Sequence, residues 1–190
     1  MVSVIIPVWG DYKKYLDECL DSVKAQTYKD YEIIVIDDEI DIAKARNKGI
    51  GQAQGDWIVI LDVDNKLTPN YLEKTVYKGD IVATDLQHFG DNDDIFETMY
   101  PTLEVMKKRN VVDANAGFRK SVWEKVGGYD ENMPIRGWED YDFWYRCLKA
   151  DYDIDVISEP LVLYRIHGYT MGQEINGENS IKLQNYIINK

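Results

Sequence analysis

Short apolar runs alternate with amphipathic segments through the first half of the chain. Residues 15–25 and 42–54 repeat apolar side chains at helical spacing, and the second of these segments ends at Gly55, a residue that commonly follows a helix. The apolar runs around them have the length of buried strands: Val2–Val8, Glu32–Ile36 and Trp57–Leu61. This alternation is typical of crossover units on a parallel sheet, and it predicts an α/β fold.

The second half of the chain is less regular. It predicts further strands at Asp80–Thr84 and Asp113–Phe118, an extended segment at Val156–Ile166, and helices at Leu103–Arg109, Ser121–Val126 and Trp138–Lys149. The residues after Gly168 are polar as far as Ile181. We therefore expect a single domain over residues 1–168 and a partly ordered tail over residues 169–190.

The composition narrows the range of partners. The 190 residues hold 22 Lys and Arg against 34 Asp and Glu, a formal net charge of -12. Such a chain repels nucleic acids and anionic lipid surfaces, so we expect no nucleic-acid partner. An anionic ligand would need a local basic group or a bound divalent cation.

The sequence also predicts where the protein works. Cys19 and Cys147 lie among apolar residues at helical spacing, which predicts buried, reduced thiols. Met1 leads directly into a strand-like run, and the apolar runs are too short for a transmembrane helix, which needs about 20 residues. We expect a cytoplasmic protein without a transmembrane segment.

Two predicted strands are followed by paired acids, Asp37 with Asp38 and Asp62 with Asp64. The carboxyl ends of parallel strands are the edge at which ligands bind in open α/β sheets. Two carboxylates spaced Asp-x-Asp suit Mg²⁺ or Mn²⁺. The same spacing occurs five times in this acidic chain, so only the buried strand before Asp62 distinguishes this pair. The other copies are typical of solvated loops and helix faces.

The chain resembles the family 2 glycosyltransferases, enzymes of GT-A fold that transfer a sugar from a nucleotide diphosphate donor. The resemblance covers roughly residues 1–168. It rests on motifs in the family's order: Val2–Trp9, Cys19–Thr27, Tyr31–Asp38, Ala45–Asn47, Leu61–Asp64, Gly127–Asp130, Trp138–Asp140 and Leu163–His167. It implies a GT-A, Rossmann-like and mostly parallel sheet flanked by helices.

The resemblance also implies a donor site for a nucleotide-diphospho-sugar, most often a UDP-sugar, with Mn²⁺ or Mg²⁺. The residues it implies there are Pro7, Val8 and Trp9 beside the base, Asp38 as hydrogen-bond acceptor from the base, Arg46 near base or phosphates, Asp62 near ribose or metal, Asp64 on the metal, and His167 on metal or diphosphate. From the residues alone, a strand end with a buried Trp, a solvated Arg and a structural His remain open.

For the reaction, the resemblance implies inverting transfer to a hydroxyl of a glycan, a lipid-linked or another acceptor. Asp140 matches the family's catalytic base, and Glu139 stands beside it. Taken without the resemblance, both acids fit the first turn of a helix, where the helix dipole favours negative charge. The carboxylate would take the proton of the attacking hydroxyl.

One departure separates this chain from the resembling family. Only Glu39–Lys44 lie between Asp38 and Ala45, where members usually carry an extra helix and strand, so we expect one helix-strand unit to be missing and the base pocket to be rebuilt. The shortened core leaves open a non-catalytic module that binds a nucleotide sugar or glycan. A nucleotidyltransferase would need a glycine-rich loop after the first strand, which residues 9–13 do not supply.

Overall fold

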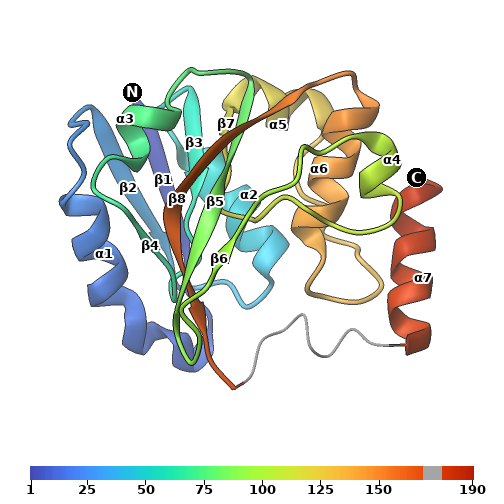
Figure 1. Ribbon diagram of the computed structural model, residues 1–190, viewed down its shortest axis with the longest axis horizontal. Coiled ribbons are helices and arrows are strands. Elements are labelled where there is room, and N and C mark those ends of the chain that lie inside the picture. The colour runs from blue at the N-terminus through green and yellow to red at the C-terminus, as the bar shows by residue number, and fades with distance from the viewer. Residues whose placement is uncertain (169–176) are drawn as a thin grey trace.

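One mixed sheet of eight strands runs through the computed structural model, which describes residues 1–168 and 177–190 (Figure 1). The strands are β1 (Val2–Pro7), β2 (Tyr31–Ile36), β3 (Trp57–Ile60), β4 (Lys66–Leu67), β5 (Ile81–Gly90), β6 (Ile95–Phe96), β7 (Gly117–Arg119) and β8 (Ile154–Ile166). Their order is β2-β1-β3-β7-β5-β8-β4, with β6 paired to β5. The predicted α/β fold is confirmed.

The parallel pairings connect the strands that the apolar runs predicted. β1 runs parallel to both β2 and β3, and β5 runs parallel to β8. The short strand β7 is antiparallel to β3 and β5, and it joins the two parallel groups into one sheet. As a result, the ends of β1 and β3 meet at one edge of the sheet.

Helices cover both faces of this sheet (Figure 1). After the 3₁₀ helix η1 (Gly10–Tyr15), the described helices are α1 (Leu16–Lys24), α2 (Ile42–Gln52), α3 (Tyr71–Thr75), α4 (Leu103–Met106), α5 (Lys120–Val126), α6 (Glu139–Lys149) and α7 (Gly177–Ile188). The core beside α1 and α3 lies on one face, and the core beside α2, α5, α6 and α7 lies on the other. None of the described helices is long and apolar enough to cross a membrane.

The side chains of β1 show how the two cores form. Ile5 points into the core beside α2, whereas its neighbours Val4 and Ile6 point into the core beside α1. Successive side chains of a strand face opposite sides of the sheet, so a strand covered on both faces is apolar throughout. The two thiols predicted to be buried and reduced lie one in each core: Cys19 and Cys147 are buried and free.

Helix α2 lies directly against β1, and a glycine permits this approach. A Cβ atom added at Gly49 would lie 2.2 Å from Cγ2 of Ile5. At its amino end, Asp41 caps α2 by accepting a hydrogen bond from the backbone N–H of Lys44 at 3.2 Å. The helix follows β2 after residues 37–41, and β2 is a sheet edge. This short connection fixes the helix that carries Arg46 close to the ends of β1 and β3.

The strands β5 and β7 differ most from their predicted bounds. β5 continues to Gly90 because it pairs with β8 along ten residues, with register shifts on both sides of Asp85. β7 begins only at Gly117, since the residues before it form a turn in which Asp113 accepts from the backbone N–H of Asn115 at 2.9 Å. This turn takes Asp113 out of the sheet. Of the tail, residues 177–188 form α7, and Leu183 and Ile187 are fully buried.

Candidate active site

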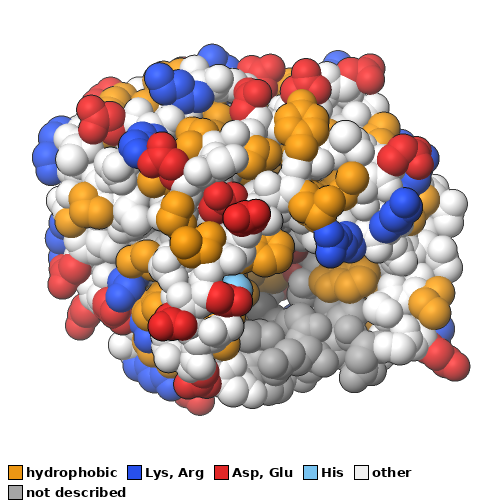
Figure 2. Space-filling model, in the orientation of Figure 1, with side chains coloured by type: hydrophobic (Ala, Val, Ile, Leu, Met, Phe, Trp, Pro, Cys, Tyr) orange, Lys and Arg blue, Asp and Glu red, His pale blue; other side chains and the backbone are white. Residues whose placement is uncertain are grey.

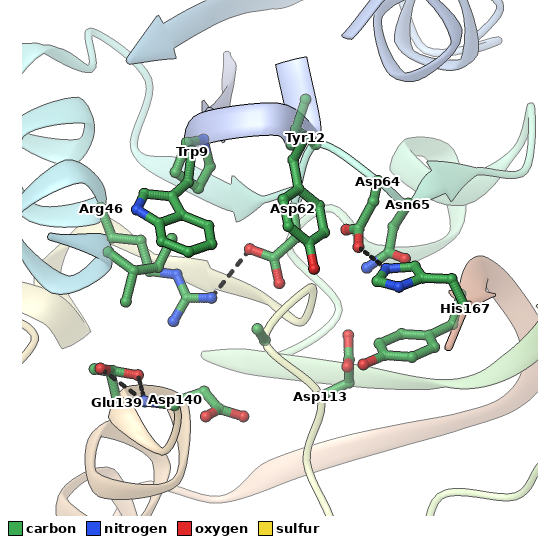
Figure 3. Close-up of a pocket in the computed structure, with 16 residues that line it drawn as sticks. Trp9, Tyr12, Arg46, Asp62, Asp64, Asn65, Asp113, Glu139, Asp140 and His167 are labelled. Carbon is green, nitrogen blue, oxygen red and sulfur yellow. Dashed lines mark hydrogen bonds and ion pairs between the residues drawn. The ribbon is translucent and has the colours of Figure 1, made fainter. Parts of the chain in front are cut away.

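A pocket of about 230 Å³ lies at the carboxyl ends of β1 and β3, facing the first turn of α6 (Figure 3). Charged groups of both halves of the chain meet there. Its lining comprises Pro7, Trp9, Tyr12, Ile42, Arg46, Asp62, Val63, Asp64, Asn65, Asp113, Ala114, Gly137, Glu139, Asp140, Tyr164 and His167. On the face of the molecule in Figure 2, by contrast, positively and negatively charged side chains are scattered, and they form no large basic patch.

Arg46 is the buried cation of the pocket. Its Nη2 donates to Oδ1 of Asp62 at 3.0 Å, and its side chain is 6% exposed. Its Nε has no hydrogen-bond partner in the described part of the chain. Burial alone would lower the pKa of Arg46, but the surrounding acids, Asp62 foremost, raise the pKa above its ordinary value. The guanidinium is therefore permanently charged, with donor capacity left for a ligand.

The neighbouring Asn47 fixes the surroundings of Arg46. The Asn47 amide donates to the backbone carbonyl of Tyr129 at 2.9 Å and accepts from the Tyr129 N–H at 2.9 Å. This holds the Tyr129 ring 5.3 Å from the Arg46 guanidinium, at cation–π distance. The turn reaches this position through Gly127, which ends α5 with a φ of +82°. Residues 45–47 and 127–130, which belong to two separate sequence motifs, therefore pack together and hold the Arg46 guanidinium in place.

Asp64 and His167 form a second pair across the pocket. Nε2 of His167 lies 3.2 Å from Oδ2 of Asp64. Burial, followed by the neighbouring charge of Asp62, raises the pKa of Asp64. Asp62 itself points toward Arg46 (Figure 3). Within the described residues, no three His, Cys, Asp or Glu side chains are grouped to hold a metal ion.

The fit of this pair to a divalent cation can be judged from its donor chemistry. Carboxylate oxygen and imidazole nitrogen are ligands that Mn²⁺ accepts, and carboxylate oxygen suits Mg²⁺. Mg²⁺ is usually bound by one or two carboxylates together with substrate phosphates rather than by a complete protein cage. Asp64 and His167 match such an incomplete ligand set. The metal roles of Asp62, Asp64 and His167 stay predictions.

Asp140 lies in the first turn of α6 and lines the same pocket. Its Oδ2 accepts a hydrogen bond from Nδ2 of Asn110 at 2.9 Å. Burial raises the pKa of Asp140 to about 7; Arg46 opposes the shift, and Asp113 adds to it. A carboxyl group with a pKa near neutrality is able both to take and to release a proton at physiological pH.

Glu139 also lines the pocket, but the backbone occupies its carboxylate. Both oxygens accept from the N–H of Gly137, at 3.0 and 2.9 Å, and the residue is 4% exposed. Gly137 has a φ of +107°, so this contact closes a turn that favours glycine. Glu139 thereby shapes the loop before α6, whereas Asp140 faces the pocket.

Aromatic side chains form the wall of the pocket at the end of β1. Trp9 is 37% exposed, and its ring centroid lies 6.0 Å from that of Tyr12. Tyr12 in turn lies 5.5 Å from the ring of His167. Pro7 lines the pocket, while Val8 is buried in the core beside α1 and is absent from the lining.

The paired acids after β2 lie outside the pocket lining. Asp38 contacts Lys48 at 2.6 Å, and its side chain is 66% exposed. Asp37 contacts Lys13 at 3.1 Å. These ion pairs join the end of β2 to α2 and η1, so the predicted contact of Asp38 with a base stays a prediction.

Four further polar lining residues are absent from the sequence-based set: Tyr12, Asn65, Asp113 and Tyr164. Asn65 is buried and accepts from the N–H of Arg165 at 2.9 Å, which joins the loop after β3 to β8. Tyr164 lies near the end of β8, three residues before His167, which follows the strand. Asp113 was missed because the sequence predicted a strand from residue 113 to residue 118, whereas the chain forms a turn before β7.

Comparison with known proteins identifies relatives of this chain. The glycosyl transferase family 2 model matches residues 3–40 and 41–127. An uncharacterised glycosyltransferase of Methanocaldococcus jannaschii is 30% identical, in a match that covers 87% of this chain and 71% of that protein. The O-antigen biosynthesis glycosyltransferase WbnJ of Escherichia coli is also 30% identical, over 88% of this chain and 80% of WbnJ.

Solved structures share the fold. TarS from S. aureus in complex with UDP-GlcNAc superposes with a TM-score of 0.78, at 16% identity, over 98% of this chain and 65% of that chain. Its complex with UDP gives a TM-score of 0.71 at the same identity. This chain therefore spans 65% of the crystallised TarS segment 1–349 and 42% of a longer TarS chain. The similarity confirms the predicted GT-A arrangement of the sheet and helices.

Proposed function

The chain belongs to glycosyltransferase family 2, and we propose that its pocket transfers a sugar, with inversion, from a nucleotide diphosphate donor to an acceptor hydroxyl. One observation carries the proposal: the buried cation Arg46 and the carboxyl group of Asp140, with a pKa of about 7, face the same pocket. A diphosphate leaving group needs positive charge, and an attacking hydroxyl needs a base. Both groups are available in one cavity.

We propose a UDP-sugar as the donor. TarS, which shares the fold, was crystallised with UDP and with UDP-GlcNAc. In this chain, Trp9 and Tyr12 offer an aromatic wall against which a planar base can stack, and Pro7 contributes backbone at the same end of the pocket. Asp38 would reach the base only after leaving Lys48.

The diphosphate would lie between Arg46 and the pair of Asp64 and His167. The guanidinium of Arg46 lines the pocket with a permanent positive charge, which suits phosphate oxygens. Asp64 and His167, with Asp62 beside them, would hold Mn²⁺ or Mg²⁺ together with phosphate oxygens. The cation, when bound, would neutralise negative charge on the departing diphosphate. This arrangement explains how a chain of net charge -12 would bind an anionic donor.

Asp140 would act as the general base. Asn110 donates to its Oδ2 at 2.9 Å and so fixes the carboxylate against the pocket. The acceptor hydroxyl would give its proton to Asp140 as its oxygen attacks the anomeric carbon on the face opposite the leaving phosphate, which inverts the configuration. Glu139 would serve this step through the loop that it closes at Gly137.

The experiment is a binding and turnover screen of the intact chain. We expect UDP-sugars to raise the melting temperature, more strongly with Mn²⁺ or Mg²⁺ than with EDTA, and UDP to be released when an acceptor is added. Asp64→Asn and His167→Ala should lose the metal-dependent part of this rise. A chain that no nucleotide sugar stabilises, with or without metal, would contradict the proposal.

The alternative is a module that binds a nucleotide sugar or glycan without turnover. The joint presence of Asp64 and Asp140 in the pocket favours an enzyme, because binding alone gives Asp140 no task. Release of UDP from a UDP-sugar, at a rate that Asp140→Asn abolishes, would exclude the binding module.

A further inference from the structure

Asp113 is the pocket carboxylate to which the proposed reaction assigns no role. It lies in the turn before β7 and lines the pocket together with Asp62 and Asp140. Figure 3 shows its carboxylate directed into the space between the Asp62 and Asp64 side and the α6 side. A group in this space is beside the base and beside the proposed diphosphate site at the same time.

The carboxylate is held rigidly. Its Oδ1 accepts from the backbone N–H of Asn115 at 2.9 Å and from the side-chain amide of the same residue. Asn115 is 1% exposed, and its Oδ1 accepts from the N–H of Asp62 at 3.0 Å. The Asn115 carbonyl accepts from the hydroxyl of Tyr71 at 2.6 Å. Asp113 is thus fixed relative to Asp62, the residue that pairs with Arg46.

The second oxygen of Asp113 is left for a ligand. Within the described residues, Oδ2 accepts no hydrogen bond, and Asp113 takes part in no ion pair. A partly desolvated carboxylate without a cation needs hydrogen-bond donors from another source. Sugar hydroxyl groups are such donors, and they bring no charge that would disturb Asp140 or the diphosphate.

We propose that Asp113 accepts hydrogen bonds from hydroxyl groups of the transferred sugar and thereby selects the donor sugar. The inference rests on the proposed function, since it places the diphosphate at Arg46. The sugar is bonded directly to that diphosphate and has to reach Asp140, and Asp113 lines the same cavity on the side of Asp64 and His167 (Figure 3). A carboxylate fixed through Asn115 discriminates between sugars because a missing hydroxyl leaves Oδ2 without a donor.

The test separates the sugar from the nucleotide. Titration calorimetry with Mn²⁺ would compare UDP, UDP-glucose and UDP-GlcNAc on the wild type, on Asp113→Asn and on Asp113→Ala. We expect affinity for the preferred UDP-sugar to fall about ten-fold or more in Asp113→Ala, and affinity for UDP to stay within about two-fold. The matched control is Asp93→Asn, an exposed acid outside the pocket, with wild-type affinities.

Deoxy analogues sharpen the result. Removing the sugar hydroxyl that donates to Asp113 should lower the affinity of the wild type for the UDP-sugar and leave the affinity of Asp113→Ala unchanged. The two losses of affinity are then not additive. Asp113→Asn keeps the Oδ1 acceptor for the N–H of Asn115, so the turn before β7 is preserved in this variant. A loss of sugar affinity that Asp113→Asn shares with Asp113→Ala is therefore not caused by unfolding.

Each outcome decides a specific point. An equal loss of UDP and UDP-sugar affinity, or no loss of either, would overturn the role of Asp113 while the proposed function stands. A higher acceptor KM with unchanged donor affinity would assign Asp113 to the acceptor and also overturn it. A wild type that binds neither UDP nor a UDP-sugar would refute the proposed function itself, and this inference with it.

Discussion

The guanidinium of Arg46 lies 3.0 Å from the carboxylate of Asp62. Arg46 is the only Lys or Arg among the described residues that line the pocket, where it faces five acids: Asp62, Asp64, Asp113, Glu139 and Asp140. In this acidic pocket, Arg46 is therefore the side chain that offsets the negative charge of the surrounding carboxylates when an anionic donor binds. Binding of an anionic donor should depend on this residue more than on any other side chain of the lining.

Arg46→Ala should lower affinity for UDP at least ten-fold, because it removes the one fixed cation and leaves Asp62 and the phosphates mutually repulsive. Arg46→Lys should lose less, since it keeps the charge but not the planar set of donors. Titration calorimetry measures both. Wild-type affinity in Arg46→Ala would show that the diphosphate lies elsewhere.

Asn110→Ala should move the acid limb of the pH–rate profile to higher pH. The Asn110 amide donates to Asp140 and stabilises its charged form, so its loss raises the pKa of a carboxyl group that is already at about 7. The rate should fall more at pH 6 than at pH 8.5, with affinity for UDP unchanged. An equal loss at both pH values would point to a structural role only.

The stability of the folded chain should depend on pH through the titration of Asp140. Its pKa is raised from about 4 to about 7, so the native state binds this proton more tightly than the unfolded state, and its contribution to stability falls as the pH rises between these values. Asp140→Asn removes this loss. The melting temperature of the variant minus that of the wild type should be more positive at pH 8 than at pH 5. A difference independent of pH would contradict the raised pKa.

Lys190→Ala should destabilise the domain by about 1–3 kcal/mol, because Nζ of Lys190 donates at 2.9 Å to Asp142, a fully buried carboxylate that would retain only Arg146. The control is Lys149→Ala, an exposed residue of α6, with a change within about 0.5 kcal/mol. Urea unfolding measures both. Equal effects would show that α7 is held by its apolar side chains, such as Leu183 and Ile187.

The sequence predicted correctly those strands whose side chains are apolar because both faces are covered. β1 and β3 are covered by helices on both faces, so their apolar runs were unambiguous, and the acids after β3 were placed at the correct sheet edge. The extent of β5 was underestimated. Its second half, residues 86–90, mixes apolar and polar side chains without a clear pattern, and its backbone ladder with β8 is what extends the strand.

The pocket was predictable where a side chain belongs to a motif, as for Arg46, Asp140 and His167. It was not predictable where position depends on a turn. Asp113 reaches the pocket because Asn115 bends the chain out of a strand, a contact between side chain and backbone that leaves no periodicity in the sequence. Asp38 is likewise 66% exposed and paired with Lys48 outside the pocket lining, a placement that the motif did not predict.

In the proposed reaction Asp140 takes the acceptor proton while the rest of the pocket holds the donor. The most direct test is the rate of UDP release at saturating UDP-sugar and acceptor for the wild type, Asp140→Asn and Glu139→Gln. We expect a loss of about 10²–10⁴-fold in Asp140→Asn with intact affinity for UDP, and a smaller loss in Glu139→Gln. A wild-type rate in Asp140→Asn would contradict it.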